Sequence, residues 1–270
     1  MKKFGLLGGS LAHSKSPILH REIMKSAKIS GDYMLFEAKN EEELKEVIER
    51  LRNGEIHGIN VTIPHKQRVI PYLDSMSEAA KSIGAVNVIA NQEGKLVGYN
   101  TDYDGFRVTL TKMKLLLKDE EVFVLGAGGA SKAVVKALLD EGARVSVVSR
   151  EPQRAATSFC NFIGVKFITY QELNEKRGVL IVNCTPCGMV PNIDTSAVSK
   201  ECVRNFENVI DIVYNPYTTQ FMSFATSNAQ VENGLYMLVV QAIRAQEIWN
   251  GVEIDCVDTV FKHMERVYQS

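Results

Sequence analysis

The sequence predicts an α/β protein with two parts, each built around a mostly parallel sheet. Three observations support this prediction. Strand-like apolar runs alternate with segments of helical periodicity along most of the 270 residues. A glycine-rich turn near the middle of the chain stands between a strand and a helix, which is the rhythm of a doubly wound sheet. The last forty residues contain helical patterns without a strand between them.

The first hundred residues alternate strands with helices. Pro64 ends the third strand, and Asn91 to Lys95 form the turn of a hairpin that we expect at the sheet edge. Early glutamates favour the start of the second helix. The predicted elements are strands at 3–8, 32–37 and 56–63, helices from about Pro17 to Lys28 and at 41–52, and hairpin strands at 86–90 and 96–99.

A second unit begins near Asp104. Its strands and helices alternate as βαβ units, and two helices then complete the chain and are expected to pack back on the first unit. The predicted elements are helices at 105–117 and 130–141, strands at 121–125, 143–148, 166–169, 179–183 and 208–212, and tail helices at 233–250 and 255–268.

Composition excludes several classes of partner. Thirty-one basic and 32 acidic residues give a formal net charge of -1, so neither a nucleic acid nor a membrane is an expected partner. No stretch reaches the roughly 20 apolar residues that span a bilayer. Lys2 and Lys3 precede apolar residues, but this run is too short for a signal peptide and predicts a first strand. A cytoplasmic protein is expected.

Five cysteines are scattered through the chain, and Cys184 and Cys187 form a C-x-x-C pair. Such a pair can serve redox exchange or supply half of a zinc site. No second pair completes a metal set, and Cys184 follows an apolar run instead of opening a helix. We therefore expect no metal site and no redox function here.

A dinucleotide site is predicted at Gly126-Ala127-Gly128-Gly129-Ala130-Ser131, which joins a strand to a helix. Gly126 permits the tight turn, and Gly128 lets the backbone approach a pyrophosphate at the helix N-terminus. Gly8-Gly9-Ser10 also follows a strand but lacks the third position of the motif.

The residues after the next strand bear on the choice between NADP and NAD. NAD-binding proteins usually carry an acidic residue here, whereas this chain has Ser149 and Arg150, with Arg154 one helical turn later. Arginine can pair with a 2′-phosphate, which favours NADP(H). Glu151 opposes this preference, and Arg150 could instead be a surface residue paired with Glu151.

Polar residues in the first unit suggest a substrate site. Asn60 and Thr62 share one face of a strand. Lys66 is expected to begin a short helix with Val69 and Ile70, where the helix dipole favours proton release, although its spacing fits a surface lysine equally well. Asp102 is either an N-cap or the partner of Lys66 in an acid/base pair. Further polar candidates are Ser14, Ser16, Asn87 and Gln241.

Taken in order, these motifs resemble those of shikimate dehydrogenases. The resemblance covers nearly the whole chain. It rests on His13 to Pro17, Asn60 to Lys66, Gly84 to Asn87, Asn100 to Asp102, Gly126 to Ser131, Thr185 to Met189 and Gly234 to Ala242. Ser149-Arg150-Glu151 departs from the family's Asn-Arg-Thr signature, which leaves the strength of the NADP preference open.

The resemblance implies NADP-dependent conversion of 3-dehydroshikimate to shikimate in the chorismate pathway of aromatic amino acid biosynthesis. It implies a substrate domain at 1–103 plus 233–270 and a Rossmann-type NADP domain at 104–232. Lys66 and Asp102 would be catalytic, and Ser14 and Ser16 would hold the carboxylate with help from Tyr214. Asn60, Thr62, Asn87 and Gln241 would bind ring hydroxyls. The cofactor would contact Gly126, Ala127, Gly128, Gly129, Ala130, Ser149, Arg150, Arg154, Ile212 and Gly234.

Two other functions remain as alternatives. One is a quinate/shikimate dehydrogenase that prefers NAD. The other is a non-catalytic metabolite sensor on the same fold, although ligand binding alone would not require both Lys66 and Asp102. The expected partners are small molecules, and the protein is expected to be a monomer or a homodimer.

Overall fold

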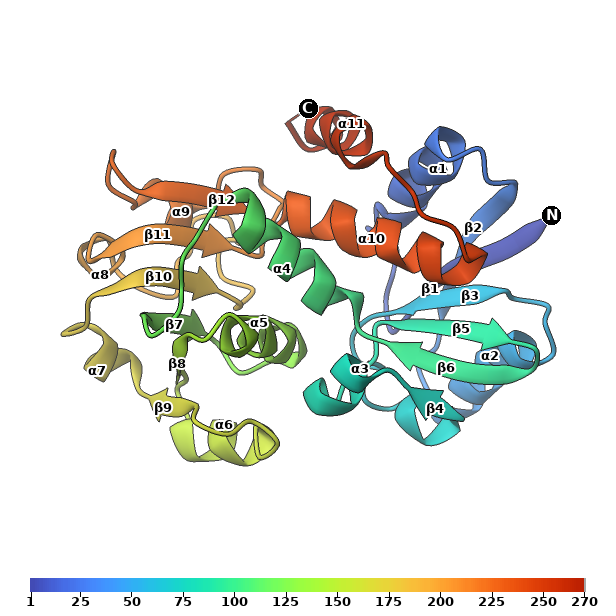
Figure 1. Cartoon of the computed structure of the whole chain (residues 1–270), viewed down its shortest axis with the longest axis horizontal. Coiled ribbons are helices and arrows are strands. Elements are labelled where there is room, and N and C mark those ends of the chain that lie inside the picture. The colour runs from blue at the N-terminus through green and yellow to red at the C-terminus, as the bar shows by residue number, and fades with distance from the viewer. Residues whose placement is uncertain (270) are drawn as a thin grey trace. The chain divides into compact units, whose positions relative to one another are not determined.

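The computed structural model describes residues 1–269, which form two compact units. Unit 1 contains Met1–Asp104 and Val239–Lys262, and unit 2 contains Gly105–Leu238 and residues 263–269. Each unit is built on one six-stranded sheet (Figure 1). No helix in the described residues is long and apolar enough to cross a membrane.

The sheet of unit 1 has the strand order β2-β1-β3-β5-β6-β4. Its first three strands are parallel, β5 is antiparallel to β3 and β6, and β4 is parallel to β6. The strands are β1 (Lys2–Gly8), β2 (Gly31–Glu37), β3 (Gly58–Val61), β4 (Ser75–Met76), β5 (Val88–Gln92) and β6 (Lys95–Tyr99). The hairpin β5–β6 therefore forms as predicted but does not lie at the sheet edge, because β4 pairs with β6.

Helices cover both faces of this sheet. Leu44, Val47, Ile48 and Leu51 of α2 pack with Leu7 and Ile59 on one face. On the other face, Met24 of α1 and Trp249 of α10 (Leu235–Asn250) pack with Phe4 and Tyr33. This alternation follows from the two-residue period of a strand. The helices of unit 1 are α1 (Ser16–Ser26), α2 (Glu41–Arg52), the 3-10 turn η1 (Ile70–Tyr72) and α3 (Glu78–Ile83).

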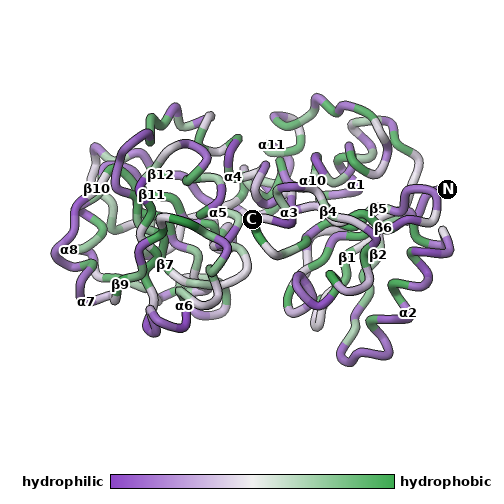
Figure 2. The backbone as a smooth tube through the Cα atoms, turned by 60° about the horizontal axis from the view of Figure 1, so that its bottom comes forward, coloured by the Kyte–Doolittle hydropathy of each residue, from purple (hydrophilic) through white to green (hydrophobic). Residues whose placement is uncertain are grey.

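The sheet of unit 2 is entirely parallel, in the order β12-β11-β10-β7-β8-β9. Numbered from its own first strand and read from β9, this is 3-2-1-4-5-6, the order of a dinucleotide-binding Rossmann sheet. The strands are β7 (Glu121–Leu125), β8 (Arg144–Val148), β9 (Lys166–Ile168), β10 (Gly178–Asn183), β11 (Phe206–Asp211) and β12 (Gln230–Asn233). Figure 2 shows hydrophobic colour along its central strands, as expected for a sheet covered on both faces.

Most helices of unit 2 follow strands in βα order, and three of the longer ones, α4, α10 and α11, contain residues of both units. The helices are α4 (Thr101–Lys112), α5 (Gly129–Asp140), α6 (Pro152–Ser158), α7 (Tyr170–Leu173), α8 (Lys200–Val203), α9 (Gln220–Ser223), α10 (Leu235–Asn250) and α11 (Val257–Gln269). The helix predicted at 105–117 thus begins four residues earlier, at Thr101, and ends at Lys112. Two residues after this end, Lys114 adopts a positive φ of 54°.

Candidate functional site

Lys66 and Asp102 form a close and largely shielded ion pair in unit 1. The Lys66 Nζ donates to Asp102 Oδ2 at 2.5 Å. Their side chains are 19% and 14% exposed, so both groups are largely shielded yet still reachable. An ammonium and a carboxylate in this arrangement can donate a proton to a bound oxygen and keep the donor in place.

Asn87 fixes the second oxygen of this carboxylate. Its Nδ2 donates to Asp102 Oδ1 at 2.9 Å and to Thr101 Oγ1 at 3.1 Å, and its Oδ1 accepts from the Thr101 backbone N–H at 2.7 Å. Gln241 of α10 joins the group, because its Oε1 lies 3.5 Å from both Asn87 Nδ2 and Thr101 Oγ1. Both amide atoms of Asn87 thus have protein partners, which hold Asp102 in one orientation.

Lys66 lies in a turn, and the helix predicted to begin at this residue is absent. Residues 66–69 form a hydrogen-bonded turn, and the 3-10 turn η1 starts only at Ile70. The Lys66 carbonyl accepts from the Val86 N–H at 2.8 Å, so the backbone here is tied to a neighbouring segment. No helix dipole therefore acts on Lys66, contrary to the prediction. Its position comes from this turn, whose His65 is buried with Nε2 2.8 Å from the Ala38 carbonyl.

Asp102 lies in the first turn of α4 and is not the N-cap. The helix begins at Thr101, and Asn100 accepts the Tyr103 N–H through its side chain at 3.3 Å. Asn100 also donates to the Ala85 carbonyl at 3.0 Å. Because Asn100 takes the capping role, the carboxylate of Asp102 is left for Lys66 and Asn87.

Asn60 is connected to the same group. It is buried on β3, and its Nδ2 lies 3.5 Å from the Asn87 carbonyl. Thr62 follows directly after β3, and its N–H donates to the Leu7 carbonyl at 2.9 Å. The structure thus brings together five of the predicted substrate-site residues, namely Asn60, Lys66, Asn87, Asp102 and Gln241.

Ser14 and Ser16 form a separate hydroxyl pair after β1. Their Oγ atoms are 3.1 Å apart, and the Ser16 N–H donates to Ser14 Oγ at 3.3 Å. Tyr214 belongs to unit 2, where its ring meets that of Tyr268 edge-on at 5.2 Å. Two neighbouring hydroxyls can hold a carboxylate.

The predicted dinucleotide turn has the expected geometry in unit 2. Gly126 has a φ of +94°, and a Cβ there would lie 2.9 Å from Thr185 Cγ2, so only glycine fits. At Gly128 and Gly129 a Cβ would meet no atom within 4 Å, so the turn is open to a ligand. Helix α5 begins with Gly128 as its N-cap and has no side-chain cap bond, which leaves its first N–H groups available to a phosphate. These features fit a dinucleotide.

The end of β8 carries the predicted phosphate-recognition residues. The Ser149 Oγ accepts from the Glu151 N–H at 3.1 Å, which bends the chain into α6. Arg150 is exposed, and Arg154 pairs with Glu151 at 3.2 Å with side chains 84% and 64% exposed. Glu151 therefore pairs with Arg154, and not with Arg150 as the alternative supposed. A pair this exposed is weak and can yield to a ligand phosphate.

A buried carboxylate organises the two loops that follow β10 and β11. Asp211 is fully buried, and it accepts from Asn183 Nδ2 at 2.9 Å, the Val213 N–H at 3.0 Å and Thr219 Oγ1 at 2.6 Å. Burial raises the pKa of Asp211 to about 6, and these hydrogen bonds oppose the rise. The loop includes Ile212, whose carbonyl oxygen would lie 2.0 Å from a Cβ at Gly234, so a larger residue at 234 would displace it.

The C-x-x-C pair lies in the loop after β10. Burial raises the pKa of the Cys184 thiol well above its ordinary value, and the nearby Asp211 adds to this effect. A thiol that resists ionisation is a poor nucleophile and metal ligand. Among residues 1–269 no group of His, Cys, Asp and Glu side chains is arranged to hold a metal.

Several residues that shape the site are not singled out by the sequence. Thr101 holds Asn87, Tyr33 contacts Asn60, and Asp211 joins two loops. Thr101 lies between Asn100 and Asp102 in one of the motifs described above, and this position is the sequence signal that could have identified it. Tyr33 contacts Asn60, which is 27 residues away in the sequence. Asp211 contacts Thr219 and Asn183, which are 8 and 28 residues away. No local pattern marks Tyr33 or Asp211.

Comparison with known proteins identifies the family. Residues 6–89 match the shikimate dehydrogenase substrate binding domain, and residues 109–185 match the shikimate / quinate 5-dehydrogenase domain. The chain is 43% identical over 258 residues to a shikimate dehydrogenase (NADP(+)) of Clostridium perfringens, covering 94% of each. It is also similar to a chorismate mutase/shikimate 5-dehydrogenase fusion protein from Clostridium acetobutylicum, with 40% identity, a TM-score of 0.95, and coverage of 100% of this chain and 99% of that one.

A third relative was crystallised with both of its ligands. It is the shikimate 5-dehydrogenase of Thermus thermophilus in complex with NADP(H) and shikimate. This chain is 33% identical to it with a TM-score of 0.89, covering 98% of this chain and 99% of that one. Together these matches confirm the resemblance found in the motifs: the chain belongs to the shikimate dehydrogenase family.

Proposed function

We propose that this protein catalyses the reversible, NADP-dependent reduction of 3-dehydroshikimate to shikimate. The observation that carries the proposal is the Lys66–Asp102 pair, held at 2.5 Å and oriented by Asn87 in a chain of this family. A family member that only sensed a metabolite would have no need of a shielded proton donor next to a fixed carboxylate.

The chain's own residues supply proton transfer and orientation. NADPH, when bound, supplies the hydride that reduces the C3 carbonyl carbon. Lys66 donates a proton to the carbonyl oxygen as negative charge develops there, so that the product is an alcohol. Asp102 keeps the ammonium directed through its Oδ2, while Asn87 holds Oδ1. In the reverse direction Lys66 accepts the proton of the alcohol.

Substrate recognition is assigned to the remaining polar residues. Ser14 and Ser16 hold the carboxylate, and Tyr214 assists them. Asn60, Thr62, Asn87 and Gln241 bind ring hydroxyls. The connection of Asn60, Asn87 and Gln241 to the Lys66–Asp102 pair supports this assignment, because hydroxyl recognition and proton transfer then involve one hydrogen-bonded group.

The cofactor residues are assigned to unit 2. Gly126, Ala127, Gly128, Gly129 and Ala130 receive the pyrophosphate at the start of α5, and Ile212 and Gly234 line the nicotinamide pocket. Ser149, Arg150 and Arg154 receive the 2′-phosphate. The exposed Arg150 and the weak Arg154–Glu151 pair support a preference for NADP(H), because both arginines are available to an anion.

This assignment makes unit 1 the substrate domain and unit 2 the NADP domain. We further propose that the enzyme works in the cytoplasm as a monomer or a homodimer. The unpaired cysteines among the described residues support a reducing compartment.

A spectrophotometric assay tests the proposal. Purified protein is mixed with shikimate and NADP+, and the appearance of NADPH is followed. We expect turnover that requires both compounds and is faster with NADP+ than with NAD+, and faster with shikimate than with quinate. Faster turnover with NAD+ and quinate would instead identify a quinate/shikimate dehydrogenase. Binding of shikimate without any turnover would identify a sensor.

A further inference from the structure

Asn60 is held by a buried tyrosine that no step of the proposed reaction uses. The Tyr33 hydroxyl lies 2.7 Å from Asn60 Oδ1, and Tyr33 is only 1% exposed. Tyr33 stands on β2 and Asn60 on β3, with β1 between them, so the tyrosine side chain extends across one strand to reach the amide. Burial raises the pKa of Tyr33 well above its ordinary value, which keeps its hydroxyl protonated as a donor.

The oxygen and the nitrogen of the Asn60 side-chain amide therefore have different partners. Its Oδ1 accepts from Tyr33, and its Nδ2 faces the Asn87 carbonyl oxygen at 3.5 Å. A carbonyl oxygen only accepts, so the reversed amide would place two acceptors against each other. Within residues 1–269 the Asn87 carbonyl is the one hydrogen-bond partner of Nδ2, and this leaves its second N–H for a ligand.

Tyr33 is itself held by His20. The two rings are stacked, with centroids 4.0 Å apart and planes at 8°. Burial lowers the pKa of His20 to about 3, so the imidazole is neutral and adds no buried charge. Its Nδ1 lies 3.1 Å from Gln246 Nε2, and since an amide N–H only donates, Nδ1 accepts and the ring proton is on Nε2.

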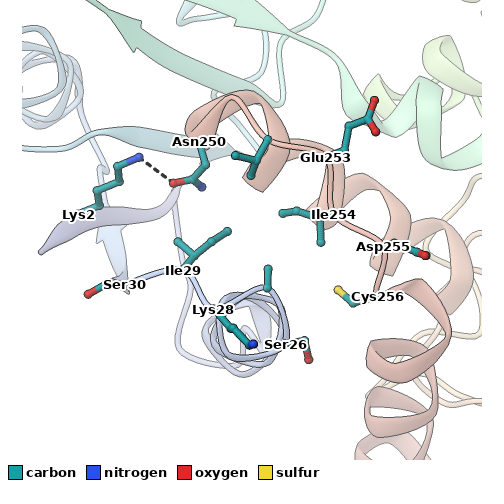
Figure 3. A pocket seen from close by; sticks show the side chains of 12 residues that line it. Lys2, Ser26, Lys28, Ile29, Ser30, Asn250, Glu253, Ile254, Asp255 and Cys256 are labelled. Carbon is teal, nitrogen blue, oxygen red and sulfur yellow. Dashed lines mark hydrogen bonds between the residues drawn. The ribbon is translucent and has the colours of Figure 1, made fainter.

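A chain of hydrogen bonds fixes the orientation of Gln246. Lys2 Nζ donates to Asn250 Oδ1 at 2.9 Å, as Figure 3 shows, and Asn250 Nδ2 donates to Gln246 Oε1 at 3.1 Å. A lysine can only donate, so it sets the direction of each amide after it. The imidazole that stacks on Tyr33 is thus fixed in place and in tautomer by groups remote from Asn60.

We propose that Tyr33 is a positioning residue that holds the Asn60 amide in place while the Asn87 carbonyl sets its direction, so that Asn60 offers its N–H, and not its carbonyl oxygen, to a ring hydroxyl oxygen of the substrate. This inference rests on the proposed role of Asn60 in binding shikimate. It assigns the direction of one substrate hydrogen bond and names a side chain that holds the donor in place.

The test compares Tyr33→Phe with Tyr72→Phe. Tyr33→Phe keeps the stacked ring and removes the hydroxyl, so Asn60 loses one of the two contacts that hold its amide. Tyr72→Phe removes a hydroxyl that contacts Glu41 elsewhere in unit 1 and serves as the control. We expect Tyr33→Phe to raise the shikimate KM roughly 2- to 12-fold, the net worth of one hydrogen bond, with kcat and the NADP+ KM near wild type. Tyr72→Phe should leave the shikimate KM unchanged.

A double-mutant cycle with Asn60→Ala separates positioning from a general structural effect. If Tyr33 acts through Asn60, Tyr33→Phe should add nothing to the shikimate KM of Asn60→Ala. An equal rise in both backgrounds, or an unchanged KM in Tyr33→Phe, would overturn the proposal.

Asn60→Asp provides a second test that leaves Tyr33 intact. It keeps the acceptor for Tyr33 and removes the N–H, so the shikimate KM should rise at least as far as in Asn60→Ala. A wild-type KM in Asn60→Asp would show that the substrate uses the oxygen of Asn60, and the proposed orientation would be wrong. Failure of the wild-type protein to turn over shikimate would instead refute the proposed function itself.

Discussion

Replacement of Lys66 by alanine is expected to remove the proton donor without disturbing the rest of the site. Asp102 would keep its bond from Asn87 Nδ2 at 2.9 Å, so the carboxylate stays oriented. The substitution removes the Lys66 ammonium, which lies 2.5 Å from that carboxylate. Because this side chain is only 19% exposed, water is a poor replacement for it. General acid catalysis contributes roughly 10²–10⁴ in rate, which corresponds to about 2.7–5.5 kcal/mol of transition-state stabilisation.

The assay measures kcat with shikimate and NADP+ for Lys66→Ala, Asp102→Asn and the double mutant, together with NADP+ affinity. Asp102→Asn should lose less than Lys66→Ala, since the lysine remains. The double mutant should lose less than the product of the two single losses, because the residues act as one unit. Lys81→Ala is the control, since Lys81 pairs with Glu78 at 2.7 Å on the surface of the same unit.

One result would refute this reasoning. If Lys66→Ala kept a near-normal kcat and only raised the shikimate KM, Lys66 would be a binding residue and another group would donate the proton.

Three further predictions concern the cofactor, the substrate carboxylate and a buried acid. Arg150→Ala should weaken NADP+ binding roughly tenfold to a hundredfold in fluorescence titrations but barely affect NAD+, and equal losses would refute the phosphate contact. Ser14→Ala with Ser16→Ala should raise the shikimate KM with little change in kcat, because the carboxylate is bound in ground and transition states alike, and a loss confined to kcat would contradict this. Burial raises the pKa of Asp211 from 3.8 to about 6. As the pH rises from about 4 to about 6, the wild type should therefore lose about 3 kcal/mol of unfolding free energy relative to Asp211→Asn. Denaturant titrations across this range would show a constant difference if Asp211 titrates normally in the fold.

The local pattern of the sequence predicts most strands and long helices. The apolar period of α2, the hairpin β5–β6 and the strands of the Rossmann sheet all appear close to their predicted positions. The βα turn at Gly126 is also predictable, because the positive φ that the turn requires favours glycine at this position. Each of these features depends on neighbours along the chain.

The failures concern features that tertiary contacts decide. The helix expected at Lys66 is replaced by turns, since the Lys66 carbonyl bonds to Val86 instead of continuing a helix. Asn100 and Asp102 are both good caps by residue type, and only the structure shows that Asn100 occupies that position. The contact between Tyr33 and Asn60 crosses an intervening strand, so no local pattern reveals it.

The most direct test of the proposed reaction is to follow the hydride and the proton separately. The protein is incubated with 3-dehydroshikimate and NADPH that carries deuterium at the transferable position, and the product is analysed by mass spectrometry and NMR. We predict shikimate with a single deuterium on the C3 carbon, because the hydride goes to carbon while Lys66 delivers an exchangeable proton to oxygen. Product without deuterium, or no reduced product at all, would contradict the proposed function.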